Sequence, residues 1–225
     1  MKVRPMNEKR RIVVLLMAAA ICVTLLTGCS SISAKALVQG NLDTIYLNQY
    51  DEDYINLVNS TAEELGKEYE EGIGVEVEYF AEYFDIDLSL CGDSYRTEID
   101  NMLRRIYMFS KYEVGSESKN GETYLVEVTI YPIDIISKIM DEDAEDFTEK
   151  WQSRVENGEF DNSTEEEVEQ TWAREIIDMV DARINSIGYL DPQTISVQVT
   201  KDDDDYYRID SGDFDRIDSL IIQYS

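Results

Sequence analysis

The sequence NGETYLVEVTIYP, from Asn120 to Pro132, decides the fold class because its residues alternate between two faces. A period of two is typical of a strand with one buried face, and Asn-Gly is a favoured turn between paired strands. Pro132 lacks the N–H that a sheet ladder needs and marks the end of the strand. With the preceding residues from Tyr112, this stretch predicts a β-hairpin.

A second alternating pair follows near the C-terminal end. Ile195, Val197 and Val199 face Tyr207 and Ile209 across a connection from Lys201 to Asp205. Two hairpins can join into one antiparallel sheet, which is more stable than either hairpin alone.

Amphipathic helices are predicted before and between the hairpins, where apolar residues recur every three or four positions. The expected ranges are 34–48, 61–85, 93–109, 136–155 and 163–187, with a short helix capped by Asp213 at the end. Ser60-Thr61-Ala62-Glu63 and Ser163-Thr164-Glu165-Glu166 are capping signals for two of them. The order predicts an α+β fold in which the long helices cover the apolar face of an antiparallel sheet. Residues 34–225 are expected to form a single domain of this kind.

The first residues have the layout of an export signal. Basic side chains from Lys2 to Arg11 precede the uncharged run Ile12 to Leu26. A run of this length, about fifteen residues, is shorter than the roughly 20 residues that cross a bilayer. We therefore expect residues 1–28 to be a signal peptide that is removed.

The run ends in Leu26-Thr27-Gly28-Cys29, which resembles the lipobox of bacterial lipoproteins. The resemblance implies that Leu26, Thr27 and Gly28 are recognised by the signal peptidase and that Cys29 is lipidated. Several acyl chains, such as palmitate, would hold the chain on the extracytoplasmic face of the cell membrane. Residues 29–33 would then form a short tether. The alternative is an ordinary secretory signal with a coincidental cysteine.

Without residues 1–28, the chain has 15 basic and 47 acidic residues and a net charge of −32. Such a chain is repelled by nucleic acid, whereas a cationic partner or divalent ions suit its charge. Its hydrophobic content of 43% and its fifteen Tyr indicate a folded chain rather than a disordered acidic tail.

The sequence excludes several kinds of active site. It contains no His, which removes the commonest general base and the usual zinc and copper ligands. No Gly-rich phosphate loop follows a predicted strand, and no cofactor is expected. Once Cys22 leaves with the signal and Cys29 is lipidated, Cys91 has no disulfide partner and is expected to be a buried, unreactive residue.

Two acidic runs are candidate Ca²⁺ ligands, since this ion prefers carboxylate oxygens. They are Asp141 to Asp146 and the group Asp202, Asp203, Asp204 and Asp205. Neither run fits an EF-hand loop, and the favoured interpretation is a solvated helix face and a solvated turn. No metal site is therefore assigned.

A tyrosine series has two interpretations. Tyr46, Tyr50 and Tyr54 are four residues apart, as are Tyr79 and Tyr83. They could form an aromatic recognition surface, but half-buried core at a helix edge is favoured.

Segments at both ends of the expected domain resemble a family of small Gram-positive lipoproteins of unknown function. They include LVQGNLDTIY from Leu37, LVNSTAEE from Leu57 and VQVTKDDDDYYRID from Val197. The layout of helices and sheet is also similar to NTF2-like or cystatin-like domains, which cradle ligands or partners. Neither resemblance carries catalytic or binding residues to this chain.

We expect a non-catalytic, lipid-anchored surface domain that binds a small ligand or an envelope protein. One alternative is a hydrolase of cell-wall or other polysaccharide that acts through paired carboxylates. Another is a structural spacer or accessory subunit.

Overall fold

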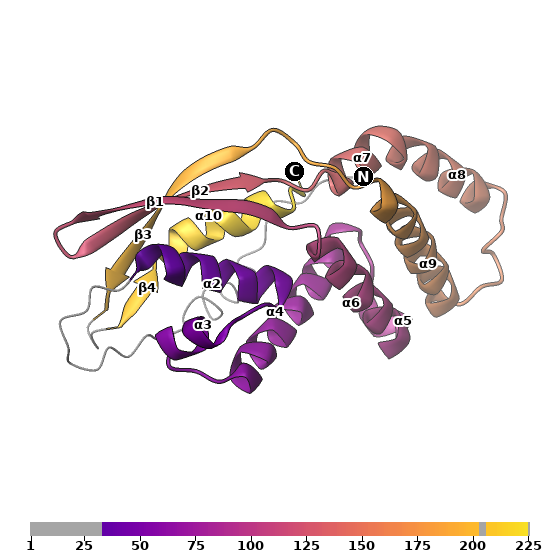
Figure 1. Ribbon diagram of the computed structural model, residues 1–225. Coiled ribbons are helices and arrows are strands. Elements are labelled where there is room, and N and C mark those ends of the chain that lie inside the picture. The colour runs from indigo at the N-terminus through magenta and orange to yellow at the C-terminus, as the bar shows by residue number, and fades with distance from the viewer. Residues whose placement is uncertain (1–32, 203–205, 225) are drawn as a thin grey trace.

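The computed structural model describes residues 33–202 and 206–224, which fold into a four-stranded antiparallel sheet with helices packed on one of its faces (Figure 1). The strands lie in the order β1 (Lys111–Asn120), β2 (Thr123–Tyr131), β3 (Gln193–Lys201) and β4 (Tyr207–Ile209). The predicted α+β class and the joining of two hairpins into one sheet are confirmed.

The two hairpins meet along β2 and β3. Val126 lies opposite Val197 and Val128 opposite Ile195, and all four side chains are buried. On the other face, the hydroxyl groups of Thr129 and Thr194 form an exposed hydrogen bond. One face of the sheet therefore forms core and the other meets solvent, as the period of two predicts.

Two helices of moderate length cover the apolar face, namely α2 (Ala34–Leu47) and α10 (Ser211–Ile221). The longest helix, α4 (Ala62–Tyr83), packs against α2 and forms a further layer (Figure 1). The expectation that the long helices cover the sheet holds for α2, whereas α4 packs its apolar stripe against α2 and α6 instead.

A helical half continues from the end of the sheet (Figure 1). It contains α5 (Leu88–Cys91), α6 (Asp93–Tyr107), α7 (Ile135–Glu142), α8 (Ala144–Glu156) and α9 (Glu165–Arg183), followed by the short 3₁₀ helix η1 (Ile184–Ser186). The helix α9 contacts α5, α6 and α7 and is the centre of this half.

Three details of the helices differ from the sequence-based expectation. The single helix expected at 136–155 is two helices, α7 and α8, which meet at Asp143. The short helices α3 (Glu52–Leu57) and α5 were not predicted. Each is capped by an Asp side chain that precedes it, Asp51 for α3 and Asp87 for α5.

Both capping boxes lie one residue later than predicted. They join Thr61 to Glu64 at α4 and Thr164 to Glu167 at α9.

The sequence predicts Asp93 and Asp213 as the N-caps of α6 and α10, and both predictions are wrong. The helix α6 is preceded by Gly92, whose φ of 84° lies in the region that favours glycine, so Asp93 is the first helical residue. The cap of α10 is Asp210, whereas the predicted cap, Asp213, lies in the first turn.

The edge strand β1 is interrupted in its middle. Its register against β2 shifts between Val114 and Glu117, which marks a β-bulge. Near the bulge, the carboxylate of Glu117 accepts a 2.7 Å hydrogen bond from the backbone N–H of Lys35, at the start of α2. The bulge therefore turns a charged side chain toward the helix layer.

Candidate functional site

The lipidation and peptidase residues predicted at the N-terminus, Leu26, Thr27, Gly28 and Cys29, lie outside the described residues. So do Asp203, Asp204 and Asp205 of the second acidic run. Of that run, only Asp202 can be placed.

Asp202 lies at the end of the β3–β4 hairpin and is bound by its own chain. Its carboxylate forms a 2.6 Å ion pair with Arg208 and accepts a 2.9 Å hydrogen bond from the backbone N–H of Tyr206. Its own N–H donates to the Tyr206 carbonyl. These contacts join the end of β3 to the start of β4, so Asp202 has a structural role.

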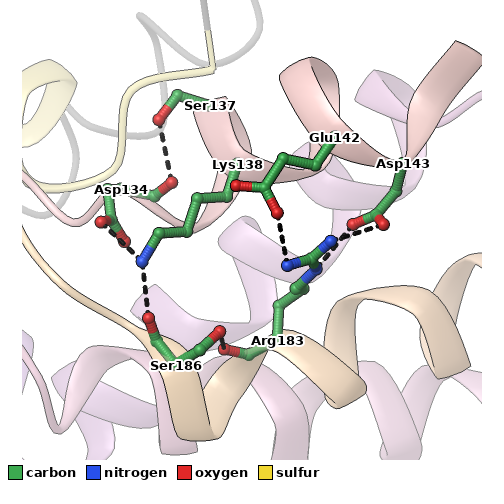
Figure 2. A network of polar contacts seen from close by, with 7 residues as sticks. All are labelled: Asp134, Ser137, Lys138, Glu142, Asp143, Arg183 and Ser186. Carbon is green, nitrogen blue, oxygen red and sulfur yellow. Dashed lines mark hydrogen bonds and ion pairs between the residues drawn. The ribbon is translucent and has the colours of Figure 1, made fainter.

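The first acidic run, 141–146, lies around the junction of α7 and α8 (Figure 2). The guanidinium of Arg183, at the end of α9, donates two hydrogen bonds to Asp143 and one to Glu142. A bidentate pair of this geometry is stronger than a single exposed ion pair. The two carboxylates therefore anchor α9 at the break between the helices. Among the described residues, no cluster of three or more acidic or Cys side chains has the arrangement of a metal site.

A second set of contacts in Figure 2 ties α7 to the segment that leads into β3. The buried carboxylate of Asp134 pairs with Lys138 at 2.9 Å and accepts a hydrogen bond from the Gly188 N–H at 2.8 Å. Lys138 also donates to the Ser186 carbonyl. The Ser137 and Ser186 hydroxyls donate to backbone carbonyls, so this cluster holds the chain in place and presents no activated nucleophile.

Two further buried carboxylates lie on α10, where they bind groups of the sheet and of α2. Asp213 accepts a 2.8 Å hydrogen bond from the Gln198 N–H of β3. Asp218 accepts a 3.3 Å hydrogen bond from the Tyr46 hydroxyl. Both hold α10 in position under the sheet.

Cys91, at the end of α5, is 4% exposed. Burial, together with the nearby carboxylates of Glu169 and Asp87, raises the pKa of its thiol to about 11. Little thiolate forms near neutral pH, which agrees with the expectation of a buried, unreactive cysteine.

The tyrosine series is part of the core. Tyr46 and Tyr54 are buried, and the Tyr50 hydroxyl donates to the Ala62 carbonyl. Tyr79 and Tyr83 are partly buried and pack edge-on against the ring of Tyr224. The interpretation as half-buried core is thus confirmed over that of a recognition surface.

Residues 141–183, which we call the acidic arm, carry the aromatic cluster of the helical half. The ring centres of Phe147 and Trp151, both on α8, lie 5.1 and 5.0 Å from the ring centre of Trp172 on α9. All three rings are only partly buried. Ring contacts rather than buried aliphatic side chains therefore hold α8 against α9.

Arg154 closes the cluster at its outer end. Its guanidinium lies 5.2 Å from the ring centres of both Trp151 and Phe160. It also pairs with Glu159 at 2.7 Å and with Glu175 at 2.5 Å. A cation of the chain itself thus covers the aromatic rings at this end.

A second exposed apolar area lies where α6 enters β1. Met108 is 77% exposed, Phe109 36% and Tyr189 41%. The Tyr189 hydroxyl donates to the Phe109 carbonyl, and the Lys111 ammonium lies 5.4 Å from the Tyr189 ring centre. We call Met108, Phe109 and Tyr189 the corner patch. The patch could not be predicted from the sequence, because Phe109 falls within the helix expected at 93–109 but lies past the end of α6.

No family model and no curated protein matches the chain. Among solved structures, the fold is similar to that of ycdA, a candidate lipoprotein from Bacillus subtilis subsp. subtilis strain 168, with a TM-score of 0.58 and 14% identity. The alignment covers 84% of this chain and 56% of ycdA, so the chain spans little more than half the length of that protein. At this identity, the likeness shows a shared fold.

Within the described ranges, none of the helices combines the length and the apolar character that crossing a membrane requires.

Proposed function

We propose that the chain is a lipid-anchored, extracytoplasmic domain that binds a partner in the cell envelope and carries out no chemical reaction. The observation that carries this proposal is Leu26-Thr27-Gly28-Cys29 at the end of an uncharged run, directly before a folded domain. The similarity of that domain to a candidate lipoprotein supports it.

The binding part of the proposal is supported by exposed apolar side chains. The corner patch places three large apolar side chains at one end of the sheet, and Val155 of α8 is 51% exposed. Exposed apolar groups that gather at one place are typical of surfaces that meet a partner.

The anchoring is tested by comparing Cys29→Ala with Cys22→Ala, a matched substitution inside the apolar run. Wild type and Cys22→Ala are expected in the membrane fraction, with an acylated Cys29 as the first residue in mass spectrometry. Cys29→Ala should be released into the medium or remain an uncut precursor. Membrane retention of a processed Cys29→Ala chain would contradict the proposal.

The binding is tested by affinity capture from the cells' own membranes and by thermal-shift screening of small molecules. A ligand that stabilises the folded state raises its melting temperature. If no protein is enriched and no compound shifts the melting temperature, the chain is a spacer rather than a binding domain.

A further inference from the structure

The helix α8 is unusual because none of its thirteen side chains is buried. In folded proteins, the stability of a helix comes mainly from packing of its apolar face. Here that face carries the partly buried rings of Phe147 and Trp151, which pack against Trp172 of α9, and the opposite face of the helix is exposed. In Figure 1, α8 lies at the outer end of the helical half, away from the sheet.

The open surface of α8 combines charge with an apolar side chain. Glu145, Glu149 and Glu156 share one face of the helix and are exposed, and no side chain of the described residues pairs with them. Val155 lies between this acidic face and Trp151 and is 51% exposed. One exposed apolar side chain of α8 thus lies beside a row of unpaired carboxylates.

The charge of the whole arm points to one kind of occupant. The acidic arm contains sixteen acidic and four basic residues. A second copy of this chain, whose net charge is −28, is repelled by such a surface, and so is an anionic lipid surface. A positively charged polypeptide is attracted to it, and charge of this kind raises the rate of association and selects the partner.

We propose that the exposed face of α8 docks a basic, amphipathic segment of a protein partner. Lys or Arg side chains of the partner pair with Glu145, Glu149 and Glu156, and its apolar side chains cover Val155. This proposal rests on the binding function proposed above. It assigns that binding to the exposed face of α8 and to a basic protein partner. Exposed ion pairs are individually weak and are screened by salt, so the complex dissociates readily and more so at high ionic strength.

The chain provides its own probe for this surface. Trp151 and Trp172 are its two tryptophans, and both lie in the cluster beneath α8. Intrinsic tryptophan fluorescence therefore reports on the arm and on the contact of Trp172 with Phe84 at the end of α4. The ligand is a synthetic amphipathic helix made of Lys and Leu, without Trp, added to the full-length protein in micelles of a neutral detergent.

The expected result is a saturable change in fluorescence that weakens as NaCl is added. The same peptide with Glu in place of Lys should cause no change. The triple variant E145Q/E149Q/E156Q should bind about tenfold more weakly, since three exposed pairs each contribute a fraction of a kcal/mol. The matched variant E52Q/E63Q/E122Q removes the same charge far from the arm and should bind within about twofold of wild type.

The apolar contribution has its own pair of variants. Val155→Ser should weaken binding, whereas Val75→Ser removes a partly exposed valine of α4, outside the acidic arm, and should leave binding unchanged. Circular dichroism of each variant verifies that it is folded.

Two results would overturn the proposal. If both triple variants lose affinity equally, the peptide responds to net charge and not to α8. If millimolar CaCl₂ alone reproduces the fluorescence change, the arm responds to cations in general rather than to a polypeptide. Either failure, with membrane retention still dependent on Cys29, removes the docking surface but leaves the anchoring proposal standing.

Discussion

The indole N–H of Trp172, on α9, donates a 2.9 Å hydrogen bond to the carbonyl of Phe84, the residue that follows α4. The last carbonyls of a helix have no partner within the helix, and this bond provides one. It also links the longest helix of the sheet half to the central helix of the helical half.

We expect Trp172→Phe to lower the free energy of unfolding by about 1–2 kcal/mol, because the ring remains but the carbonyl loses its donor. Urea titration followed by circular dichroism measures the change. Trp151→Phe alters the same cluster and keeps the bond to Phe84, so it controls for the smaller ring. Equal losses in the two variants would assign the effect to ring packing alone.

Gly40, on α2, is required by a close approach to α3. A Cβ at this position would lie 2.0 Å from Cδ2 of the buried Tyr54 ring. Gly40→Ala should therefore destabilise the fold by roughly 1–3 kcal/mol or more. Gly74→Ala is the matched control, since a Cβ there meets nothing within 4 Å and the helix gains up to about 1 kcal/mol. Melting temperatures of the two variants should shift in opposite directions.

Glu68, on α4, gives the protein a pH-dependent stability. Burial, followed by repulsion from Glu64 and Glu71, raises the pKa of its carboxyl from 4.5 to about 7. The folded state then holds this proton more tightly than the unfolded state, so the free energy of unfolding falls as the pH rises from about 4.5 to about 7.

Glu68→Gln should consequently be more stable than wild type at pH 8, and its advantage should disappear below pH 4.5. Thermal denaturation across this pH range measures the difference. Glu63→Gln, at an exposed position of the same helix, controls for removal of one negative charge. An advantage for Glu68→Gln that is constant with pH would contradict the assignment.

The thiol of Cys91 should react slowly with thiol reagents at pH 8 and rapidly once the protein is unfolded in urea. The reason is its burial and its pKa of about 11. Subtracting the reaction of Cys91→Ser isolates this thiol from other cysteines. Fast modification in the folded state would show that α5 opens readily.

The sheet could be predicted from the sequence because its signal is local. Alternation in β2 and β3 specifies which side chains are buried, and Val126 and Val197, which belong to the two alternating apolar series, lie opposite each other. Which helices would cover the sheet was not predictable. An apolar stripe shows that a helix packs, but it does not identify the element against which it packs.

Two errors in the prediction of the helices also have physical causes. At Ser60-Thr61, either hydroxyl could cap, and Glu63 and Glu64 supply a partner for each, so the sequence alone does not choose between them. The break at Asp143 is hidden because the apolar spacing continues through it, while the Arg183 side chain that binds Asp143 comes from α9.

The candidate docking surface, too, could be predicted from the sequence only in part. The sequence predicts that Phe147, Trp151 and Val155 share a helix face. It does not predict that this face stays half open, since this depends on α9 meeting α8 through the ring of Trp172.

The bulge in β1 has a consequence for the membrane anchoring that we propose. Chains tethered to a bilayer diffuse in two dimensions and collide often. An uninterrupted, unpaired edge strand would let neighbouring chains pair edge to edge and aggregate. The register shift between Val114 and Glu117 denies such a neighbour a continuous row of hydrogen-bonding groups. In a chain anchored as proposed, the edge of β1 therefore offers neighbouring copies no continuous strand with which to pair.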